Sequence, residues 1–374
     1  MSSANFFGVS LPGVIFSRIA TRETALRLHL NERSLANTRR LLLNQTCFGA
    51  DFQRKGRLIL PIVVAMLLDV VLGDPKTIPH PVVLVGTIIS FWERVLYTGG
   101  SMRAKGVIFC SAVALTAGGA VFLALKLAAA LHPYIYDVLN VYLLFTALAC
   151  RSLKDEAMSV ADALAGGGVP LARTRLSGIV GRDTSALLED GIARATIETV
   201  AESYIDGVVS VLFYMTAGSF FGCESLFAWL FKTVSTMDSM VGYDNARYKN
   251  FGLAAARLDD ALNFIPARLG AVLAIAAASF SKYDYRRAVR IFIRDRLKHK
   301  SPNSAHGESV FAGLLGISLG GGAYYDGEFE ARPWLGEGLR APGLPDIWSA
   351  CDILDRAYML CMLAVLIVTG CIYV

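Results

Sequence analysis

The chain alternates long runs of apolar residues with short polar segments. Three runs approach or exceed the roughly 20 helical residues that cross about 30 Å of hydrocarbon; they are residues 106–131, 207–231 and 357–374. Weaker candidates, each short or carrying an ionisable residue, are residues 58–72, 82–97, 134–150 and 264–280. The pattern predicts an all-α, polytopic integral membrane protein with about four to six membrane helices and cytoplasmic helical loops.

The polar segments also favour helices. Residues 151–206 show helical periodicity that is interrupted by one loop signal, AGGGVP at 165–170. Residues 281–300 form a basic amphipathic stretch, which suits a helix facing solvent or lipid head groups. Residues 301–346 are rich in Gly and Pro, and we read them as a long ordered loop.

The distribution of basic residues constrains the topology. Nearly every polar segment is basic and so favours the cytoplasmic side, whereas strict alternation of single crossings would export some of them. We therefore expect at least one apolar run to be re-entrant or interfacial. The run 207–231, with Gly218, Gly222 and Glu224 in its interior, is one candidate, and the short run 82–97 is another.

Composition agrees with a membrane location. Of 374 residues, 54% are hydrophobic and 18% are charged, and the formal net charge is +5. Nucleic-acid binding is disfavoured, because no basic stripe is interleaved with exposed aromatic residues. We divide the chain into a basic N-terminal extension, 1–57, and a multi-spanning domain, 58–374. The extension suits either a cytoplasmic segment lying on anionic lipid or a targeting segment.

Polar residues interrupt the apolar pattern in four clusters. In the first, Asp69 and Asp74 end an apolar run, and His80 follows in a proline-rich turn. Carboxylates beside a membrane span are costly and are therefore functional candidates. A turn cap at Asp74 and an interfacial hydrogen bond at His80 explain these residues equally well.

The second cluster is a stripe of charges. Asp190, Arg194, Glu198 and Glu202 recur every four residues, so they share one face of a helix, and Asp206 prolongs it. Such a stripe is often a salt-bridge ladder on a solvated face. Here it runs directly into an apolar run, which would deliver its last carboxylates to the membrane surface.

A candidate anion site precedes this stripe. Asp183 and Thr184 are natural N-caps, so we expect the helix to begin there, and a helix start favours anionic groups.

The third cluster offers oxygen ligands. Asp259 and Asn263 are four residues apart on one helical face, so with Asp260 they suit a hard divalent cation while Arg257 meets a phosphate. Magnesium with a nucleotide phosphate matches this set. Capping of the next apolar run explains it about as well.

The fourth cluster lies in residues 301–322. It contains Asn303, His306, Glu308 and three successive glycines that allow close backbone approach to a ligand. It lacks the pattern of a nucleotide-binding P-loop, and an ordinary flexible loop is the alternative.

Taken together, these segments resemble the adenosylcobinamide-phosphate synthase family of cobalamin biosynthesis. The resemblance rests on GDPKTIPHPVVLVG, RSLKDEA, VGRDTSALLEDGIARATIETVAESYIDG, TMDSMVGYDNARYKNFGLAAARLDDALNFIPARL and KSPNSAHGES, which follow the family's order from about Leu58 nearly to the C-terminus. The chain departs from the family's usual residues at Ser203 and around His306.

The resemblance implies a carbon–nitrogen ligase of the cell membrane that consumes ATP with Mg2+. It would join the free carboxylate of adenosylcobyric acid to the amine of (R)-1-amino-2-propanol or its O-phosphate, giving adenosylcobinamide or its phosphate, at a site facing the cytoplasm. The corrinoid, the aminopropanol and membrane lipid would be its partners. A homo-oligomer and complexes with other cobalamin-pathway enzymes are left open.

Site roles are assigned on that resemblance by electrostatic fit. We expect Mg2+ to be bound by Glu202, Asp206, Asp259 and Asp260. Catalysis is assigned to Glu202, Asp206, Arg257 and Asp260. Contacts with ATP, aminopropanol phosphate or the corrinoid are assigned to Arg182, Asp183, Arg247, Asn303 and His80.

A membrane transporter or sensor is the alternative, because acidic residues in a multi-span protein also mark ion pathways. A transporter is expected to place its acids in mid-span, on broken helices in paired repeats. Here they gather at the expected cytoplasmic ends, which favours an enzyme that acts on a soluble nucleotide.

Overall fold

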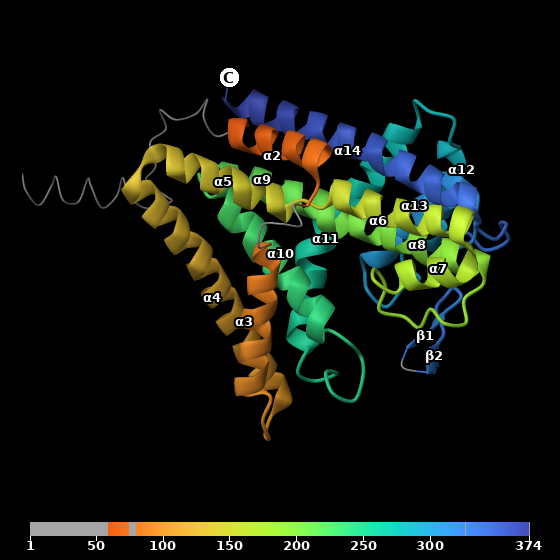
Figure 1. Ribbon diagram of the computed structural model, residues 1–374, viewed down its shortest axis with the longest axis horizontal. Coiled ribbons are helices and arrows are strands. Elements are labelled where there is room, and N and C mark those ends of the chain that lie inside the picture. The colour runs from red at the N-terminus through yellow and green to blue at the C-terminus, as the bar shows by residue number, and fades with distance from the viewer. Residues whose placement is uncertain (1–58, 75–79, 326, 374) are drawn as a thin grey trace, which may run out of the picture. The chain divides into compact units, whose positions relative to one another are not determined.

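Helices account for most of the residues that the computed structural model describes, which are 59–74, 80–325 and 327–373 (Figure 1). In chain order they are α2 (Ile59–Leu72), α3 (Pro81–Leu96), α4 (Met102–Leu131), α5 (Pro133–Ala147), α6 (Cys150–Asp162), α7 (Gly168–Leu176), α8 (Glu189–Tyr204), α9 (Ser210–Ser219), α10 (Glu224–Val241), α11 (Leu253–Ala278), α12 (Tyr285–Asp295), α13 (Ser304–Leu315) and α14 (Leu344–Tyr373). Two π-helical turns, η2 (Ala163–Gly167) and η3 (Ile205–Val209), join neighbouring helices. One short hairpin pairs β1 (Ala323–Tyr325) with β2 (Glu328–Glu330) in antiparallel register. The predicted all-α class is confirmed; the N-terminal extension lies outside the described residues.

Among the described residues, three helical stretches have the length and hydropathy to cross a membrane. They are α4, residues 133–176 and α11, and the apolar helix α2 is shorter. Large apolar side chains of α4 are exposed, such as Leu115 at 76% and Leu127 at 65%, which suits contact with lipid. The chain is a multi-pass membrane protein, as its apolar runs indicate, and the number of crossings stays a prediction.

The apolar run 207–231 is not a single crossing. α9 ends at Ser219, and the chain turns back into α10, which packs against α9. Gly222 adopts a φ of 64°, and a Cβ on Gly218 would lie 2.8 Å from the carbonyl oxygen of Cys223. Because only glycine tolerates both conditions, the run folds as a tight helical hairpin. The expectation of one long span there is wrong, because the run is divided between two helices; the expectation that it is re-entrant or interfacial stays a prediction.

Two segments expected to be loops contain helix. Residues 165–170 belong to η2 and the start of α7, so the chain stays helical through a π-helical turn. Residues 301–346 contain α13, nearly all of which is buried, as well as the β1–β2 hairpin. A Cβ on Gly307 would lie 2.4 Å from the carbonyl oxygen of Ala201 in α8. Gly307 thus serves close helix packing, whereas the glycines after α13, such as Gly320, lie in non-helical chain at positive φ, as a loop requires.

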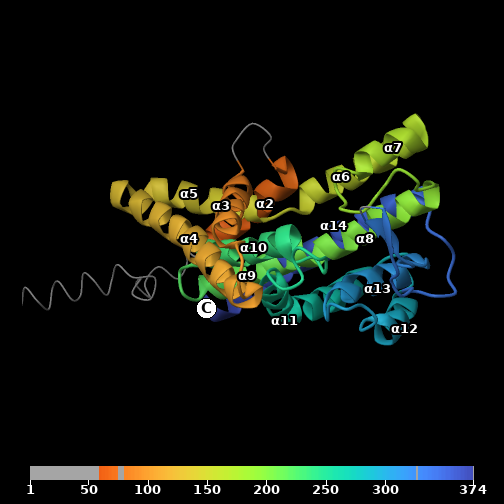
Figure 2. The ribbon, with the colours of Figure 1, turned by 90° about the horizontal axis from the view of Figure 1, so that it is seen from below.

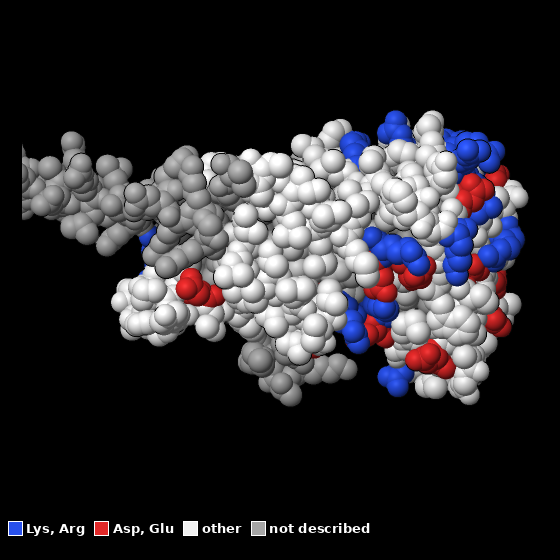
Figure 3. Space-filling view, turned by 90° about the horizontal axis from the view of Figure 1, so that it is seen from above, with Lys and Arg blue, Asp and Glu red and all other residues white. Residues whose placement is uncertain are grey.

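Charged side chains are distributed unevenly. Figure 3 shows them gathered over the part of the molecule that contains α12 and the N-terminal half of α14, whereas the surface over α2 and the C-terminal half of α14 is nearly uncharged. The basic amphipathic helix predicted within residues 281–300 is α12, which packs on the outer side of α13 (Figure 2). The uncharged surface suits lipid and the charged surface suits water or head groups.

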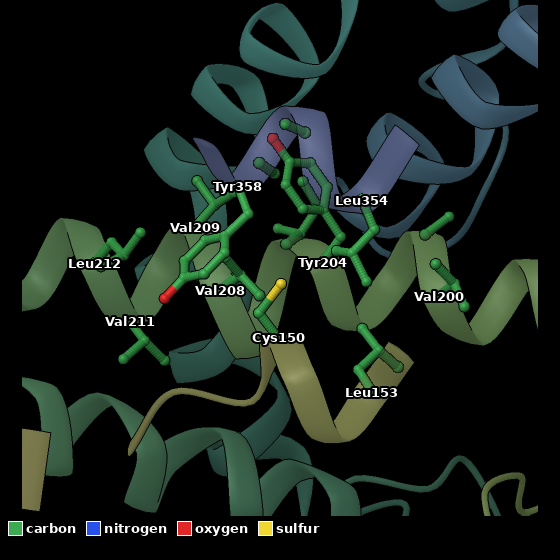
Figure 4. Close-up of a cluster of buried hydrophobic side chains, with 14 of the residues drawn as sticks. Cys150, Leu153, Val200, Tyr204, Val208, Val209, Val211, Leu212, Leu354 and Tyr358 are labelled. Atoms are coloured by element: carbon green, nitrogen blue, oxygen red, sulfur yellow. The ribbon is translucent and has the colours of Figure 1, made fainter. Parts of the chain in front are cut away.

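A buried apolar core fixes the rotation of α8 and η3. Val200, Tyr204 and Val208 pack with side chains of α6 and α14, including Tyr358 (Figure 4). The hydroxyl of Tyr204 donates to the carbonyl oxygen of Gly270 at 3.0 Å. Because these apolar residues are also four apart, they share one face, and the charged stripe of α8 is turned to the other.

We predict that Gly307→Ala destabilises the fold. The new methyl group would overlap the backbone of α8, and overpacking of this kind costs about 1–3 kcal/mol. The measurement is the thermal unfolding midpoint of the detergent-purified protein. Gly119→Ala in α4 is the matched control, since nothing lies within 4 Å of the Cβ it would add. Equal midpoints for the two variants would show that α8 and α13 are not in this contact.

Candidate functional site

Acidic side chains from several helices converge on one place. Seven carboxyl groups of the described residues influence one another electrostatically and form what we call the acid cluster: Glu198, Glu202, Asp206, Asp238, Asp259, Asp260 and Glu308. They come from α8, η3, α10, α11 and α13. The structure thus unites the second, third and fourth polar clusters of the sequence.

A π-helical turn places Asp206. α8 and α9 run on through η3, where the helix widens by one residue, a feature often found at functional sites. α11 approaches this turn closely, and glycine at position 270 permits the approach, since a Cβ there would lie 2.5 Å from Cδ1 of Ile205. The close approach brings Asp206 within electrostatic reach of Asp259 on α11, and Asp238 of α10 also acts on Asp206.

Hydrogen bonds orient the carboxylates of α11. Asn263 donates from Nδ2 to Oδ2 of Asp259 at 3.0 Å, and it accepts from the hydroxyl of Ser210 at 2.5 Å. The expected metal ligand Asn263 therefore orients Asp259 instead. The other oxygen of Asp259 is buried and has no hydrogen-bond partner in the described part of the chain. Asp260 accepts from the hydroxyl of Ser301 at 2.7 Å.

Asn303 joins the cluster from the turn before α13. Its Nδ2 donates to the carbonyl oxygen of Asp260 at 2.7 Å, and its Oδ1 accepts from Arg268 at 3.3 Å. The side chain is 6% exposed. The sequence grouped Asn303 and Asp260 in one site, and the structure places them in contact.

Two arginines enter the cluster from loops. Arg182 Nη1 lies 2.6 Å from Oε2 of Glu198, whose other oxygen accepts from the backbone N–H of Gly320 at 2.7 Å. Arg332 acts electrostatically on Glu202 and Glu308. The glycine run that we expected to approach a ligand thus approaches Glu198, and Arg332 was not foreseen, because it stands in the segment read as a loop.

Burial dominates the acid–base behaviour of the cluster. It raises the pKa of Glu308 well above its usual range, and the charges of Glu198 and Glu202 add to the effect. Burial likewise raises the pKa of Glu202, while Arg332 and Arg182 oppose that rise. Glu202 nevertheless retains accessible surface. Glu202 can have both a raised pKa and accessible surface because its carboxylate is surrounded by protein on most sides and borders water on one.

The first polar cluster reaches the same place through Lys232 of α10. This ammonium lies within the electrostatic influence of Asp69, Asp74 and Asp206. Oδ1 of Asp74 lies 3.6 Å from Nε2 of His80, and Nδ1 of His80 caps α3. His80 is therefore both a cap and a neighbour of the site. Sequence reasoning missed Lys232, although a lysine that directly follows the apolar run 207–231 could have drawn attention to it.

Three expected site residues lie apart from the acid cluster or only beside it. Arg247 is exposed and pairs with Glu93 at 2.8 Å, and the structure does not bring it to the cluster. Arg257 is exposed on α11, one turn before Asp260, and has no hydrogen bond or ion pair among the described residues. Asp183 accepts from the backbone N–H of Gly327 at 2.9 Å and so ties its loop to the β hairpin.

The helix expected to begin at Asp183 or Thr184 begins later. α8 starts at Glu189, and its N-cap Leu188 makes no side-chain hydrogen bond. That expectation is wrong, because the backbone N–H of Asp183 donates to Tyr324 of the β hairpin instead.

The donor set of the acid cluster fits a divalent cation. Arg182, Arg332 and Lys232 are the cations within its electrostatic reach among the described residues, so carboxylates outnumber them. In the described part of the chain, no three His, Cys, Asp or Glu side chains lie close enough together to hold a metal ion by themselves. Mg2+ commonly takes only one or two carboxylates and completes its shell with water and substrate phosphate.

Comparison with known proteins identifies relatives of this chain. The family model described as "CobD/Cbib protein" matches residues 62–354. The cobalamin biosynthesis protein CobD of Pelobacter propionicus is 44% identical over 281 residues, which cover 75% of this chain and 85% of that protein. CobD of Citrobacter koseri and CbiB of Salmonella typhimurium are each 39% identical and each cover 84% of this chain and 98% of their own length. No solved structure matches.

We predict that Glu308→Gln makes the protein more stable at neutral pH. The pKa of Glu308 is higher in the folded protein than in the unfolded chain. Protonated Glu308 therefore contributes its full stabilisation below the ordinary glutamate pKa. This stabilisation is lost as the pH rises through the pKa of Glu308 in the folded protein. The Gln variant keeps its neutral side chain throughout. Unfolding midpoints in Mg2+-free buffer should therefore coincide near pH 4 and diverge towards pH 8. Glu337→Gln, at an exposed position, is the control, and an equal gain there would refute the role of burial.

Proposed function

This chain belongs to the CobD/Cbib protein family, and from that premise we propose that it acts in cobalamin biosynthesis as an ATP-dependent amide ligase of the cell membrane. Its reaction would join the free carboxylate of adenosylcobyric acid to the amine of (R)-1-amino-2-propanol or its O-phosphate. The products would be adenosylcobinamide or adenosylcobinamide phosphate. The observation that carries the proposal is the convergence of the acid cluster with Arg182 and Arg332.

Amide formation needs activation of the carboxylate, because a carboxylate and an ammonium do not condense at neutral pH. In the first step a carboxylate oxygen attacks a phosphorus atom of ATP, a phosphoanhydride bond breaks, and ADP or pyrophosphate leaves. In the second step the neutral amine attacks the activated carbonyl carbon. The C–N bond forms, the C–O bond breaks, and phosphate or AMP leaves. Both the acyl phosphate and the acyl adenylate route fit the proposal.

The acid cluster would serve the first step. One or two carboxylates from the set Asp206, Asp259, Asp260 and Glu202 would hold Mg2+, which when bound neutralises phosphate charge and orients the nucleotide. The unpartnered buried oxygen of Asp259 is the group that most needs a cation.

Cationic side chains would hold the polyphosphate. The guanidinium of Arg182 lies inside the cluster, and Arg257 stands free one turn before Asp260. Guanidinium groups suit phosphate oxygens because they donate two parallel hydrogen bonds.

A carboxylate with a raised pKa would serve the second step. Glu202 combines a raised pKa with accessible surface, so it is suited to take the proton that the attacking ammonium must lose. Asn303 and His80, which touch the cluster through Asp260 and Asp74, would contact the corrinoid or orient the amine.

We place the reaction on the cytoplasmic side. ATP is a cytoplasmic substrate, and the charged surface around α12 and the N-terminal half of α14 is rich in Lys and Arg, as positive-inside topology requires (Figure 3). A transporter or sensor is the competing function. A transporter or sensor would form no amidated corrinoid, so analysis of the reaction products distinguishes it from a ligase.

The direct test is reconstitution. Purified protein in membranes, supplied with adenosylcobyric acid, ATP, Mg2+ and aminopropanol phosphate, should yield adenosylcobinamide phosphate, read by the mass of the corrinoid. Omission of either ATP or Mg2+ should stop the reaction. Failure to form any amide with either the free or the phosphorylated amine would refute the proposed function.

We predict that Asp260→Ala and Arg257→Ala lower amidation by at least about tenfold, the usual loss when a metal or phosphate site is disturbed. Membrane insertion should be unchanged, as judged by yield and thermal unfolding. Asp190→Ala is the control, because this exposed carboxylate lies on the same stripe of α8 but two turns before Glu198. Wild-type rates in the first two variants would remove both residues from the site.

A further inference from the structure

Two neighbouring arginines lack a carboxylate partner among the described residues. Arg268 of α11 and Arg296, just beyond α12, are near enough to influence each other electrostatically. Arg268 donates only to neutral oxygens, of Phe264 and Asn303, and Arg296 lies 5.7 Å from the ring centre of Phe292. Two adjacent positive charges repel each other, so an anion between them would be stabilised.

A buried histidine beside this pair also lacks hydrogen bonds. His306 is fully buried, its ring lies edge-on to Phe292 at 5.5 Å, and neither ring nitrogen has a partner among the described residues. Burial, together with Arg268 and Arg296, lowers the pKa of His306 to about 4. The neutral imidazole still has one N–H to donate, and an unsatisfied buried donor is costly. It is a second, independent sign of a missing acceptor.

The surface around the pair is apolar and exposed. On α11, Ile265 and Leu269 are 55% and 45% exposed, and beside Arg296 the side chains of Ile293 and Leu297 are 67% and 62% exposed. α12 lies on the outer side of α13, next to α11 (Figure 2). A soluble anion would bind the arginine pair but make no use of the apolar side chains. An amphiphile with an anionic head group would be stabilised by both the arginines and the apolar side chains.

We propose that Arg268 and Arg296 bind the phosphate of an anionic phospholipid, with its acyl chains against the exposed apolar residues of α11 and α12. The site differs from the acid cluster in charge and in ligand. It does not depend on the proposed ligase reaction, and the lipid is a bound partner, not a substrate.

Lipid binding by the detergent-purified protein tests this site. The probe is fluorescent phosphatidylglycerol, with phosphatidylcholine and glycerol 1-phosphate as competitors at fixed ionic strength. We expect phosphatidylglycerol to bind and unlabelled phosphatidylcholine to compete poorly, because it has no net negative charge. Glycerol 1-phosphate should also compete poorly, because it lacks acyl chains. Equal competition by glycerol 1-phosphate would assign the arginines to a soluble phosphate ligand and overturn the proposal.

Paired variants locate the site. Arg268→Gln with Arg296→Gln should weaken phosphatidylglycerol binding by at least about tenfold, given roughly 1 kcal/mol per basic residue at an anionic surface. Arg286→Gln with Arg290→Gln removes the same charge from exposed positions of α12 and should have a much smaller effect. Equal losses in the two pairs would show a diffuse basic surface, not a site.

Two further variants guard against misfolding. Arg296→Gln alone, whose described contact is with Phe292, should lower affinity in a protein that still unfolds cooperatively. Arg268→Lys with Arg296→Lys should restore part of the affinity, since the charge returns without the planar guanidinium. Unchanged binding in Arg296→Gln, or a dimer whose formation hides the face from lipid, would also contradict the proposal.

Discussion

The cost of burying negative charge inside an apolar helical bundle is the constraint on which this structure depends. Seven carboxyl groups of the described chain act on one another, and three basic side chains act on them in return. Carboxylates held together in a protein interior must be neutralised by protons, cations or hydrogen bonds. Glu198 is satisfied by Arg182 and Gly320, whereas Asp259 keeps an unpartnered oxygen. The unpartnered oxygen of Asp259 marks the place where the cation proposed above would complete the arrangement.

Clustering these carboxylates is electrostatically unfavourable, and the fold achieves it through close helix contacts. Gly307 lets α13 approach α8, and Gly270 lets α11 approach η3. On the opposite face of α8, the apolar core around Tyr204 locks the rotation of the helix (Figure 4). The packing energy of that core is what holds the acidic face in place, since the carboxylates themselves repel one another.

Local periodicity made part of this site predictable. The four-residue spacing of Glu198, Glu202 and Asp206 identified one charged face, and the resemblance grouped Asn303 with Asp260. The site residues that the sequence did not predict are placed by long-range packing. Nothing local distinguishes Arg332 from other loop arginines.

The fold was predictable to a similar extent. Helical class and membrane character follow from the apolar runs. The hairpin between α9 and α10, the π-helical turn at Asp206 and the buried helix α13 do not, because glycine in a sequence marks loops and tight helix contacts alike. The position of Arg247, paired with Glu93 away from the cluster, likewise reflects tertiary contacts.

Metal-directed cleavage tests the central claim most directly. Fe2+ that replaces Mg2+ at a nucleotide site generates hydroxyl radicals with ascorbate and peroxide, and these cut the backbone nearest to the ion. The account predicts ATP-dependent cuts in three segments at once, around Asp206, Asp238 and Asp259, and their suppression by excess Mg2+. Cuts confined to one segment, or cuts that depend on neither ATP nor Mg2+, would show that these segments do not surround a single bound cation.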